Sequence, residues 1–292
     1  MKDFILLMRP WQWAKNLFLF APLFFSGCFL KADLFVATSV AFFAYCLAAS
    51  AIYCFNDICD RESDRLHPRK RLRPVASGKI SVCSASALAL GLALCSAGVL
   101  LYFSGTQRWM LCGCVFFYLL LNAGYCVYLK RKTLIDVFVI AFGFVLRLLT
   151  GSVAPGISLS HWLLLMTFLL ALFLALAKRR DDVVIYENTG VSMRHNIKRY
   201  NLSFMNQSIA TVAAVNMVCY ILYCVSPEVT ERLGNNYLYS TSLFVLLGML
   251  RYMQLTTVDI CSGSPTHVLM HDRFIQCCIL GWGILFTVIL YL

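Results

Sequence analysis

Residues 53–79, YCFNDICDRESDRLHPRKRLRPVASGK, place a dense run of charged side chains directly after an apolar segment. Asn56, Asp57, Asp60 and Asp64 fall there at positions i, i+1, i+4 and i+8. If the apolar helix continues through them, the three carboxylates lie along one stripe about two turns long. Carboxylate oxygens are the ligands that Mg²⁺ prefers in proteins. The spacing therefore predicts a metal site made of the three aspartates at the end of an apolar helix.

Basic side chains follow the aspartates at once. The segment 67–74, HPRKRLRP, breaks the helix with two prolines and adds Arg71 and Arg73 among other basic residues. Guanidinium and ammonium groups bind phosphate oxygens through charge-assisted hydrogen bonds. Acidic groups that can hold Mg²⁺ beside basic groups that can hold phosphate indicate a diphosphate site. We expect Arg71 and Arg73 to bind the phosphates and Asn56 to add an amide contact.

The rest of the chain has the composition of a membrane protein. It is 60% hydrophobic and 13% charged, with a mean hydropathy of +0.75, far above the values of soluble domains. Apolar runs close to the ~20 residues that cross a bilayer lie at 14–31, 34–55, 82–103, 109–129, 134–153, 159–177, 206–226, 236–256 and 274–292. We therefore expect an all-α, polytopic transmembrane bundle of about nine spans.

Basic residues are concentrated on one side of the predicted bundle. With a cytoplasmic N-terminus, 21 of the 25 Lys and Arg residues are assigned to the cytoplasmic side, when Lys15 is counted before the first span and Arg251 after the eighth. The exceptions are Lys31, Arg108 and Arg232 in opposite loops, and Arg147, which we expect to snorkel from the fifth span to the outer surface. The positive-inside rule then places Asp57 on the cytoplasmic side. We expect the net charge of +11 to attract anionic lipid head groups at the membrane surface, and it does not indicate nucleic-acid binding.

Two further basic residues lie near predicted span ends on the same side. Lys15 begins the first span and would run close to the Asp57 segment in a compact bundle, so it is a candidate phosphate ligand. Lys130, also a candidate phosphate ligand, ends the fourth span, and Asp136 opens the fifth. A turn between them could bring the two side chains together. For Asp136 a functional site and a structural ion pair between adjacent helices stay open, because intramembrane charges are costly and are usually paired or functional.

A second mixed cluster follows the sixth predicted span. Lys178 precedes two arginines and the adjacent pair Asp181 and Asp182. Lys178 is a candidate phosphate ligand. Alternatively, it belongs to a positively charged segment that only marks the end of the membrane-spanning helix. The polar segment after it, about 180–204, is long enough to act as a lid.

The NDxxDxxxD pattern from Asn56 to Asp64, in a chain with many apolar spans, resembles the UbiA superfamily of intramembrane prenyltransferases. The closer resemblance, over residues 8–205, is to its decaprenyl-phosphate phosphoribosyltransferase branch. It is carried by RPWQWAKN from Arg9, HPRKRLRPVASG from His67, YLKRKTLIDVFVIAFGFVLRLLTG from Tyr128 and AKRR from Ala177. This resemblance implies a single UbiA-like membrane domain over residues 1–292, with nine spans around a central cavity and with Mg²⁺ and diphosphate at its cytoplasmic end.

The second acidic cluster departs from the aromatic prenyltransferases of that superfamily. Those enzymes usually carry a second, spaced DxxxD motif for a second Mg²⁺, whereas this chain has only the adjacent pair Asp181 and Asp182. The resemblance therefore implies Mg²⁺-dependent transfer of a 5-phosphoribosyl group from phosphoribosyl pyrophosphate to a polyprenyl phosphate, in a bacterial inner membrane. Asp57, Asp60 and Lys130 are the expected catalytic residues.

Two alternative functions are an aromatic prenyltransferase and, from a different class, a transporter. An aromatic or quinone prenyltransferase would use the same aspartates to hold a prenyl diphosphate donor, and donor identity separates it from the first hypothesis. A transporter is disfavoured, because transporters place charges near the membrane midplane and often in paired repeats. This sequence shows no such repeat, and its charges gather at one surface.

Overall fold

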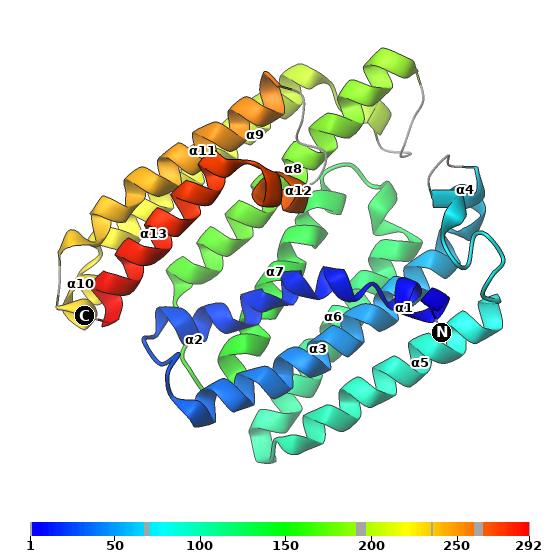
Figure 1. Cartoon of the computed structure of the whole chain (residues 1–292), viewed down its shortest axis with the longest axis horizontal. Coiled ribbons are helices and arrows are strands. Elements are labelled where there is room, and N and C mark those ends of the chain that lie inside the picture. Colours follow the sequence, from blue (N-terminus) through cyan, green and yellow to red (C-terminus); the bar gives the residue numbers. More distant parts are fainter. Residues whose placement is uncertain (1, 67–69, 191–196, 235, 260–264, 292) are drawn as a thin grey trace. The chain divides into compact units, whose positions relative to one another are not determined.

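The computed structural model describes residues 2–66, 70–190, 197–234, 236–259 and 265–291. Every regular element in these ranges is a helix (Figure 1), which confirms the all-α fold. The chain divides into two compact units. The first comprises Met1–Lys130 and Phe142–Leu159, and the second comprises Arg131–Ala141 and Ser160–Leu292.

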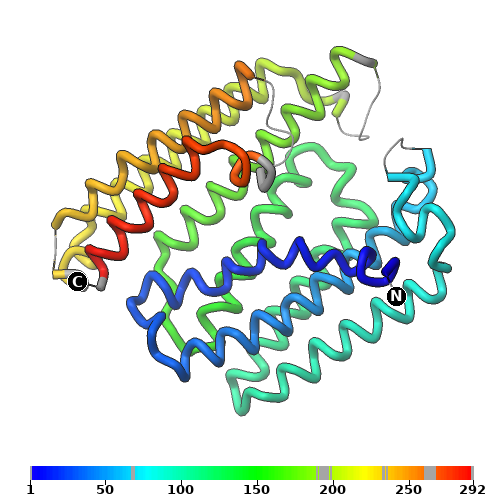
Figure 2. The backbone as a smooth tube through the Cα atoms, viewed as in Figure 1, coloured from blue at the N-terminus to red at the C-terminus, as the bar shows by residue number. Residues whose placement is uncertain are grey.

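The first unit is organised around its longest helix, α3. Its elements are α1 (Lys2–Met8), η1 (Pro10–Phe20), α2 (Ala21–Phe25), α3 (Ala32–Cys59), α4 (Arg61–Arg65), η2 (Lys70–Leu72), α5 (Val82–Val99), η3 (Leu100–Tyr102), α6 (Gly105–Val127), most of η4 (Leu129–Arg131) and the C-terminal part of α7 (Ile135–Val153). Helix α3 packs against α1, η1, α5 and α6, and Figure 2 shows it running alongside α5. Buried alanines on α3, among them Ala44 and Ala48, allow these close approaches.

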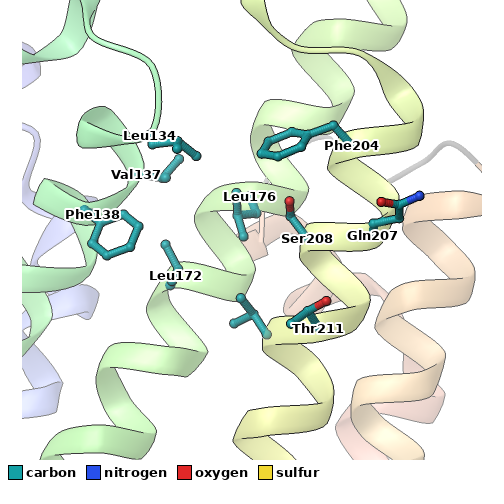
Figure 3. Close-up of a pocket in the computed structure, with 10 residues that line it drawn as sticks. Leu134, Val137, Phe138, Leu172, Leu176, Phe204, Gln207, Ser208 and Thr211 are labelled. Carbon is teal, nitrogen blue, oxygen red and sulfur yellow. The ribbon is translucent and has the colours of Figure 1, made fainter.

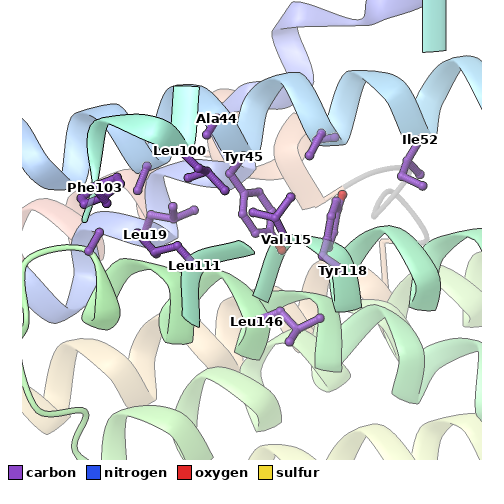
Figure 4. Close-up of a cluster of buried hydrophobic side chains, with 14 residues drawn as sticks. Leu19, Ala44, Tyr45, Ile52, Leu100, Phe103, Leu111, Val115, Tyr118 and Leu146 are labelled. Carbon is purple, nitrogen blue, oxygen red and sulfur yellow. The ribbon is translucent and has the colours of Figure 1, made fainter. Parts of the chain in front are cut away.

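Aromatic and aliphatic side chains from α3, α6 and α7 form the core of the first unit (Figure 4). The rings of Tyr45 and Tyr118 lie 4.5 Å apart between their centroids. Leu111, Val115 and Leu146 pack around them. The core therefore ties three membrane-length helices together.

The second unit is built mainly from four long helices and their connections. It contains the N-terminal part of α7, followed by α8 (His161–Thr189), η5 (Ile197–Arg199), α9 (Leu202–Val225), α10 (Pro227–Leu233), η6 (Tyr237–Thr241), α11 (Ser242–Thr257), α12 (Pro265–His271) and α13 (Arg273–Tyr291). Helix α8 packs on α9, and α11 packs on α9 and α13. The predicted polar loop from about residue 180 is in part helix, since α8 continues to Thr189 and ends at Gly190 with φ 68°.

Seven described helices are long and apolar enough to cross a membrane: α3, α5 with η3, α6, α7, α8, α9 and α13. The chain is thus an integral membrane protein, but the predicted count of nine spans is not confirmed. The apolar run 14–31 forms part of η1 and the five-residue α2. The run 236–256 forms η6 and most of α11, which has 16 residues. Each of these runs is divided between a 3-10 helix and an α-helix.

Gly151 on α7 lies where no side chain fits. A Cβ atom built there would collide with the backbone carbonyl of Leu19 on η1. We expect Gly151→Ala to lower the free energy of unfolding by about 2–3 kcal/mol, because the backbone it meets must shift. Denaturation in mixed detergent micelles measures this change. The matched control is Gly113→Ala on α6, where nothing lies within 4 Å. It should be neutral or stabilising, and equal effects at both sites would contradict the close approach.

Candidate functional site

The predicted carboxylate stripe is interrupted at Asp60. Helix α3 ends at Cys59, Asp60 takes φ −91° and ψ 0°, and α4 begins at the next residue. Asp57 on α3 and Asp64 on α4 are nonetheless both buried, with 1% and 3% of their surface exposed. Buried carboxylates require compensating partners, because leaving them unpaired in a low-dielectric environment is costly.

One arginine joins Asp57 and Asp64. The Nη1 atom of Arg73 lies 3.3 Å from Asp57 Oδ1 and 2.6 Å from Asp64 Oδ2. Asp57 Oδ1 also accepts a hydrogen bond from Nη2 of Arg9, which lies between α1 and η1. Two guanidinium groups therefore share one carboxylate oxygen in the first unit.

Asp60 has a different partner. It forms an ion pair with Lys130 of η4, and both side chains are partly exposed. Its neighbour Asn56 accepts a weak hydrogen bond from the Cys126 thiol, with 3.4 Å between Oδ1 and Sγ. The structure thus brings Asn56, Asp57, Asp60, Asp64, Arg73 and Lys130 to one end of the first unit.

The three predicted metal ligands do not converge on one point. Among the described residues, no group of three His, Cys, Asp or Glu side chains is placed to hold a metal ion. Two of the aspartates are suitably placed to share one cation, because Asp57 Oδ1 and Asp64 Oδ2 both contact the Nη1 atom of Arg73. Mg²⁺ in phosphate sites commonly uses one or two protein carboxylates, with phosphate and water completing its shell. The donor set therefore suits Mg²⁺, and the metal role of the aspartates stays a prediction.

The remaining predicted phosphate ligands, Lys15, Arg71 and Lys178, are all exposed. Lys15 on η1 and Arg71 on η2 are exposed side chains of the first unit. Lys178 is exposed on α8 and belongs to the second unit. His67, Pro68 and Arg69 lie outside the described residues.

A buried charge network occupies the second unit. Arg179 Nε lies 2.6 Å from Asp136 Oδ2, and the two side chains are 1% and 0% exposed. Arg179 also reaches Asp182, at 3.2 Å. Asp136 therefore pairs with Arg179 on α8, and Lys130 pairs with Asp60. A structural ion pair between helices is the alternative that the geometry favours for Asp136.

Tyr200 completes this network. Its hydroxyl accepts a hydrogen bond from the backbone N–H of Leu134 at 2.7 Å and donates to Asp136 at 3.3 Å. Burial raises the pKa of the Tyr200 phenol to about 12. The phenol is therefore neutral at physiological pH, and it holds the start of α7, where Leu134 has an uncommon φ of 66°.

A sequence model of the UbiA prenyltransferase family matches residues 17–259. The chain belongs to the UbiA family. It is 33% identical to the decaprenyl-phosphate phosphoribosyltransferase of Mycolicibacterium smegmatis over 94% of this chain and 88% of that protein. The enzyme of the same name from Corynebacterium glutamicum is 32% identical over 98% of this chain and 86% of its own length. These matches confirm both the superfamily and the branch that the sequence resembles.

Solved structures of UbiA proteins share the fold. A UbiA homolog from Archaeoglobus fulgidus, solved with DMAPP and Mg²⁺, superposes with a TM-score of 0.67 and 17% identity. The match covers 99% of this chain and 100% of that one. The protein is accordingly a UbiA-type transferase of the membrane.

The second unit of this UbiA protein contains a largely apolar groove of about 350 Å³ between α7, α8 and α9 (Figure 3). It is lined by Leu134, Val137, Phe138, Leu172, Leu176, Phe204, Gln207, Ser208, Thr211 and Val212. Tyr200 stacks on Phe204 with 6.1 Å between the ring centroids. The groove therefore adjoins the Asp136 network through Leu134 and Phe204.

Arg147 does not snorkel to the surface as predicted. It is 6% exposed within the first unit of the UbiA protein. Its Nε donates to Asn16 Oδ1 at 2.9 Å, and its Nη1 donates to the carbonyl of Gly143 at 2.7 Å. The guanidinium carbon lies 5.2 Å and 5.3 Å from the ring centroids of Tyr45 and Tyr118. Aromatic faces and neutral oxygens thus stabilise this cation inside the unit.

Arg147→Lys tests this environment. The planar guanidinium of Arg147 donates hydrogen bonds to Asn16 and Gly143 and also contacts the aromatic rings. The ammonium group of lysine cannot make all of these contacts at once. We expect the free energy of unfolding in mixed micelles to fall by about 2–4 kcal/mol, since buried acceptors lose their donor. Arg108→Lys, whose guanidinium bonds the carbonyls of Phe103 and Leu101 at a more exposed position, is the control. A smaller loss at Arg147 than at Arg108 would contradict the buried role.

Proposed function

We propose that the protein transfers a 5-phosphoribosyl group from phosphoribosyl pyrophosphate to a polyprenyl phosphate and releases pyrophosphate, with Mg²⁺ as cofactor. The observation that carries this proposal is the 33% identity, over 94% of the chain, to a decaprenyl-phosphate phosphoribosyltransferase. The positive-inside asymmetry supports a cytoplasmic N-terminus and reaction site in a bacterial inner membrane. One functional domain over residues 1–292 remains part of this proposal.

In this mechanism Asp57 and Asp64, with Asp60 beside them, would hold Mg²⁺. When bound, the metal would stabilise the negative charge that develops on the departing pyrophosphate. Arg73 and Lys130 would bind phosphate oxygens through charge-assisted hydrogen bonds, and Asn56 would add an amide contact. Lys15, Arg71 and Lys178 remain further candidates for phosphate binding.

The lipid phosphate is the nucleophile in the proposed reaction. One of its oxygens forms a bond to the anomeric carbon of the ribose as the bond from that carbon to pyrophosphate breaks. This nucleophile is already an anion, so no general base is required of the protein. The side chains named above therefore bind, orient and neutralise charge, and none of them needs to remove a proton.

Membranes that contain the protein, supplied with phosphoribosyl pyrophosphate labelled in the ribose and with polyprenyl phosphate, test the proposal. We expect a labelled lipid that disappears with EDTA and returns with added Mg²⁺. Membranes of the same host without the protein are the control. Absence of labelled lipid, together with transfer of a labelled prenyl group to an aromatic acceptor, would favour the alternative prenyltransferase.

A further inference from the structure

Arg9 is not one of the predicted site residues, yet it pairs with Asp57 in the acidic site. It joins α1 to η1 with φ 51° and ψ 58°, which is a left-handed backbone conformation. Residues other than glycine adopt it rarely and keep it where their surroundings impose it. The only local sequence signal is Pro10, because a residue before proline is biased away from the helical region.

Ser50 on α3 fixes the chain on both sides of Arg9. Its hydroxyl donates to the carbonyl of Met8 at 2.9 Å and accepts from Nε1 of Trp13 at 3.0 Å. Ser50 itself is fully buried. The junction that carries Arg9 is therefore fastened to α3 by a single buried hydroxyl, and the backbone of Arg9 has little freedom to turn away.

The side chain of Arg9 follows one face of α3 toward the acidic cluster. Ser50, Tyr53 and Asp57 are spaced i, i+3 and i+7, which places them on the same side of the helix. The Arg9 guanidinium lies 5.4 Å from the centroid of the Tyr53 ring and pairs with Asp57. The Arg9 side chain is 18% exposed, whereas that of Asp57 is 1% exposed. Arg9 is thus a cation held against a buried carboxylate and is itself more accessible to solvent than that carboxylate.

Each carboxylate of this site pairs with a cation within the part of the chain that the structure describes. Three carboxylates are paired by three cations, because Arg9 and Arg73 serve Asp57, Arg73 serves Asp64, and Lys130 serves Asp60. Arg9 and Arg73 both contact the same oxygen, Asp57 Oδ1. A divalent ion on that oxygen would compete with both guanidinium groups through like-charge repulsion and through the shared lone pairs. A displaced guanidinium needs another anion, and a pyrophosphate ester supplies one.

We propose that Arg9 is an exchangeable counter-ion, which pairs with Asp57 when no metal is bound and transfers to the pyrophosphate group of the substrate when metal takes over that carboxylate. This inference rests on the proposed function and adds a residue to it. Competition at Asp57 weakens the binding of metal alone, and the released Arg9 strengthens the binding of the metal–pyrophosphate complex. Metal and pyrophosphate are therefore coupled through one side chain, and such coupling is reciprocal.

Two affinities of the purified full chain in detergent test the proposal. The first is for Mn²⁺ alone, followed by electron paramagnetic resonance. The second is for radiolabelled inorganic pyrophosphate at saturating Mn²⁺, followed by equilibrium binding. We expect Arg9→Gln to tighten Mn²⁺ binding at least about fivefold and to weaken pyrophosphate binding at least about fivefold. Changes of opposite sign are specific, because a damaged fold would weaken both.

Two further variants sharpen the test. Arg9→Lys keeps the charge that competes with metal but loses the planar fork, so Mn²⁺ affinity should stay near that of the natural protein while pyrophosphate binding weakens. Lys79→Gln removes one positive charge from an exposed residue that pairs loosely with Asp3 of α1, at 3.9 Å. It should change neither affinity by more than about twofold, since exposed charges are well screened.

Failure of this inference is distinct from failure of the proposed function. If Asp57→Asn abolishes Mn²⁺ binding and Arg9→Gln leaves the Mn²⁺ affinity unchanged, the counter-ion exchange is overturned while the labelled-lipid assay can still succeed. If Arg9→Gln weakens both affinities, Arg9 has only a structural role and the exchange is again overturned. If Asp57→Asn leaves the Mn²⁺ affinity unchanged, both the counter-ion exchange and the assignment of Asp57 as a metal ligand are overturned. Absence of labelled lipid refutes the proposed function by itself.

Discussion

Asp57→Asn should reduce phosphoribosyl transfer at least about a hundredfold, which is the scale expected when charge stabilisation in a transition state is lost. The amide keeps the shape of the side chain but removes the anion that would bind metal. The fold should survive, because the partners Arg9 and Arg73 are 18% and 26% exposed and can be hydrated when the carboxylate is gone. The initial rate of label incorporation into lipid, at equal amounts of membrane-inserted protein, measures the effect.

Glu62→Gln is the matched control for Asp57→Asn. Glu62 lies on α4, close in sequence to the same aspartates, but its side chain is 77% exposed and pairs with Arg65 on the surface. The phosphoribosyl transfer rate of Glu62→Gln should remain within about twofold of that of the natural protein, since exposed ion pairs contribute little to stability. An Asp57→Asn protein that keeps more than about a tenth of the rate would remove Asp57 from the reaction.

The sequence predicts the acidic site well where neighbours along one helix decide the contacts. Asp57 and Asp64 are seven residues apart, so a nearly continuous helix places both on one side and lets Arg73 join them. Asp60 departs from the expected stripe because the helix breaks at that residue and its side chain meets Lys130. Spacing alone does not reveal where such a break falls.

Pairings between distant segments could not be predicted from spacing. Arg9 meets Asp57 across 48 residues, and Arg147 meets Asn16 across 131 residues. Arg147 was expected to snorkel because an arginine near a span end normally does so. Its stabilising partners are neutral oxygens and aromatic rings, which carry no charge signal in the sequence. The count of nine spans is not confirmed for a related reason, since hydropathy measures length and composition but not whether one helix continues.

Breaking the ion pair between Asp136 and Arg179 should have the largest effect on stability. Both side chains are buried, so removing one leaves a charge without its partner in a low-dielectric environment. We expect Asp136→Ala and Arg179→Met each to lower the free energy of unfolding by about 3–5 kcal/mol. Denaturation in mixed micelles with increasing SDS measures these changes, and Glu62→Ala at the exposed pair with Arg65 provides the control.

The double variant, with Asp136→Ala and Arg179→Met together, separates a true pair from two independent contacts. Each single change is costly because it leaves one buried charge unpaired, and the double variant leaves none of this pair. The free energy of unfolding should therefore fall by less in the double variant than the sum of the two single decreases. The residual loss reports the remaining partners, because Arg179 also bonds Asp182 and Asp136 also accepts from Tyr200. Additive losses would instead show that the two side chains stabilise the second unit separately, and the helix-to-helix ion pair would then carry no coupling of its own.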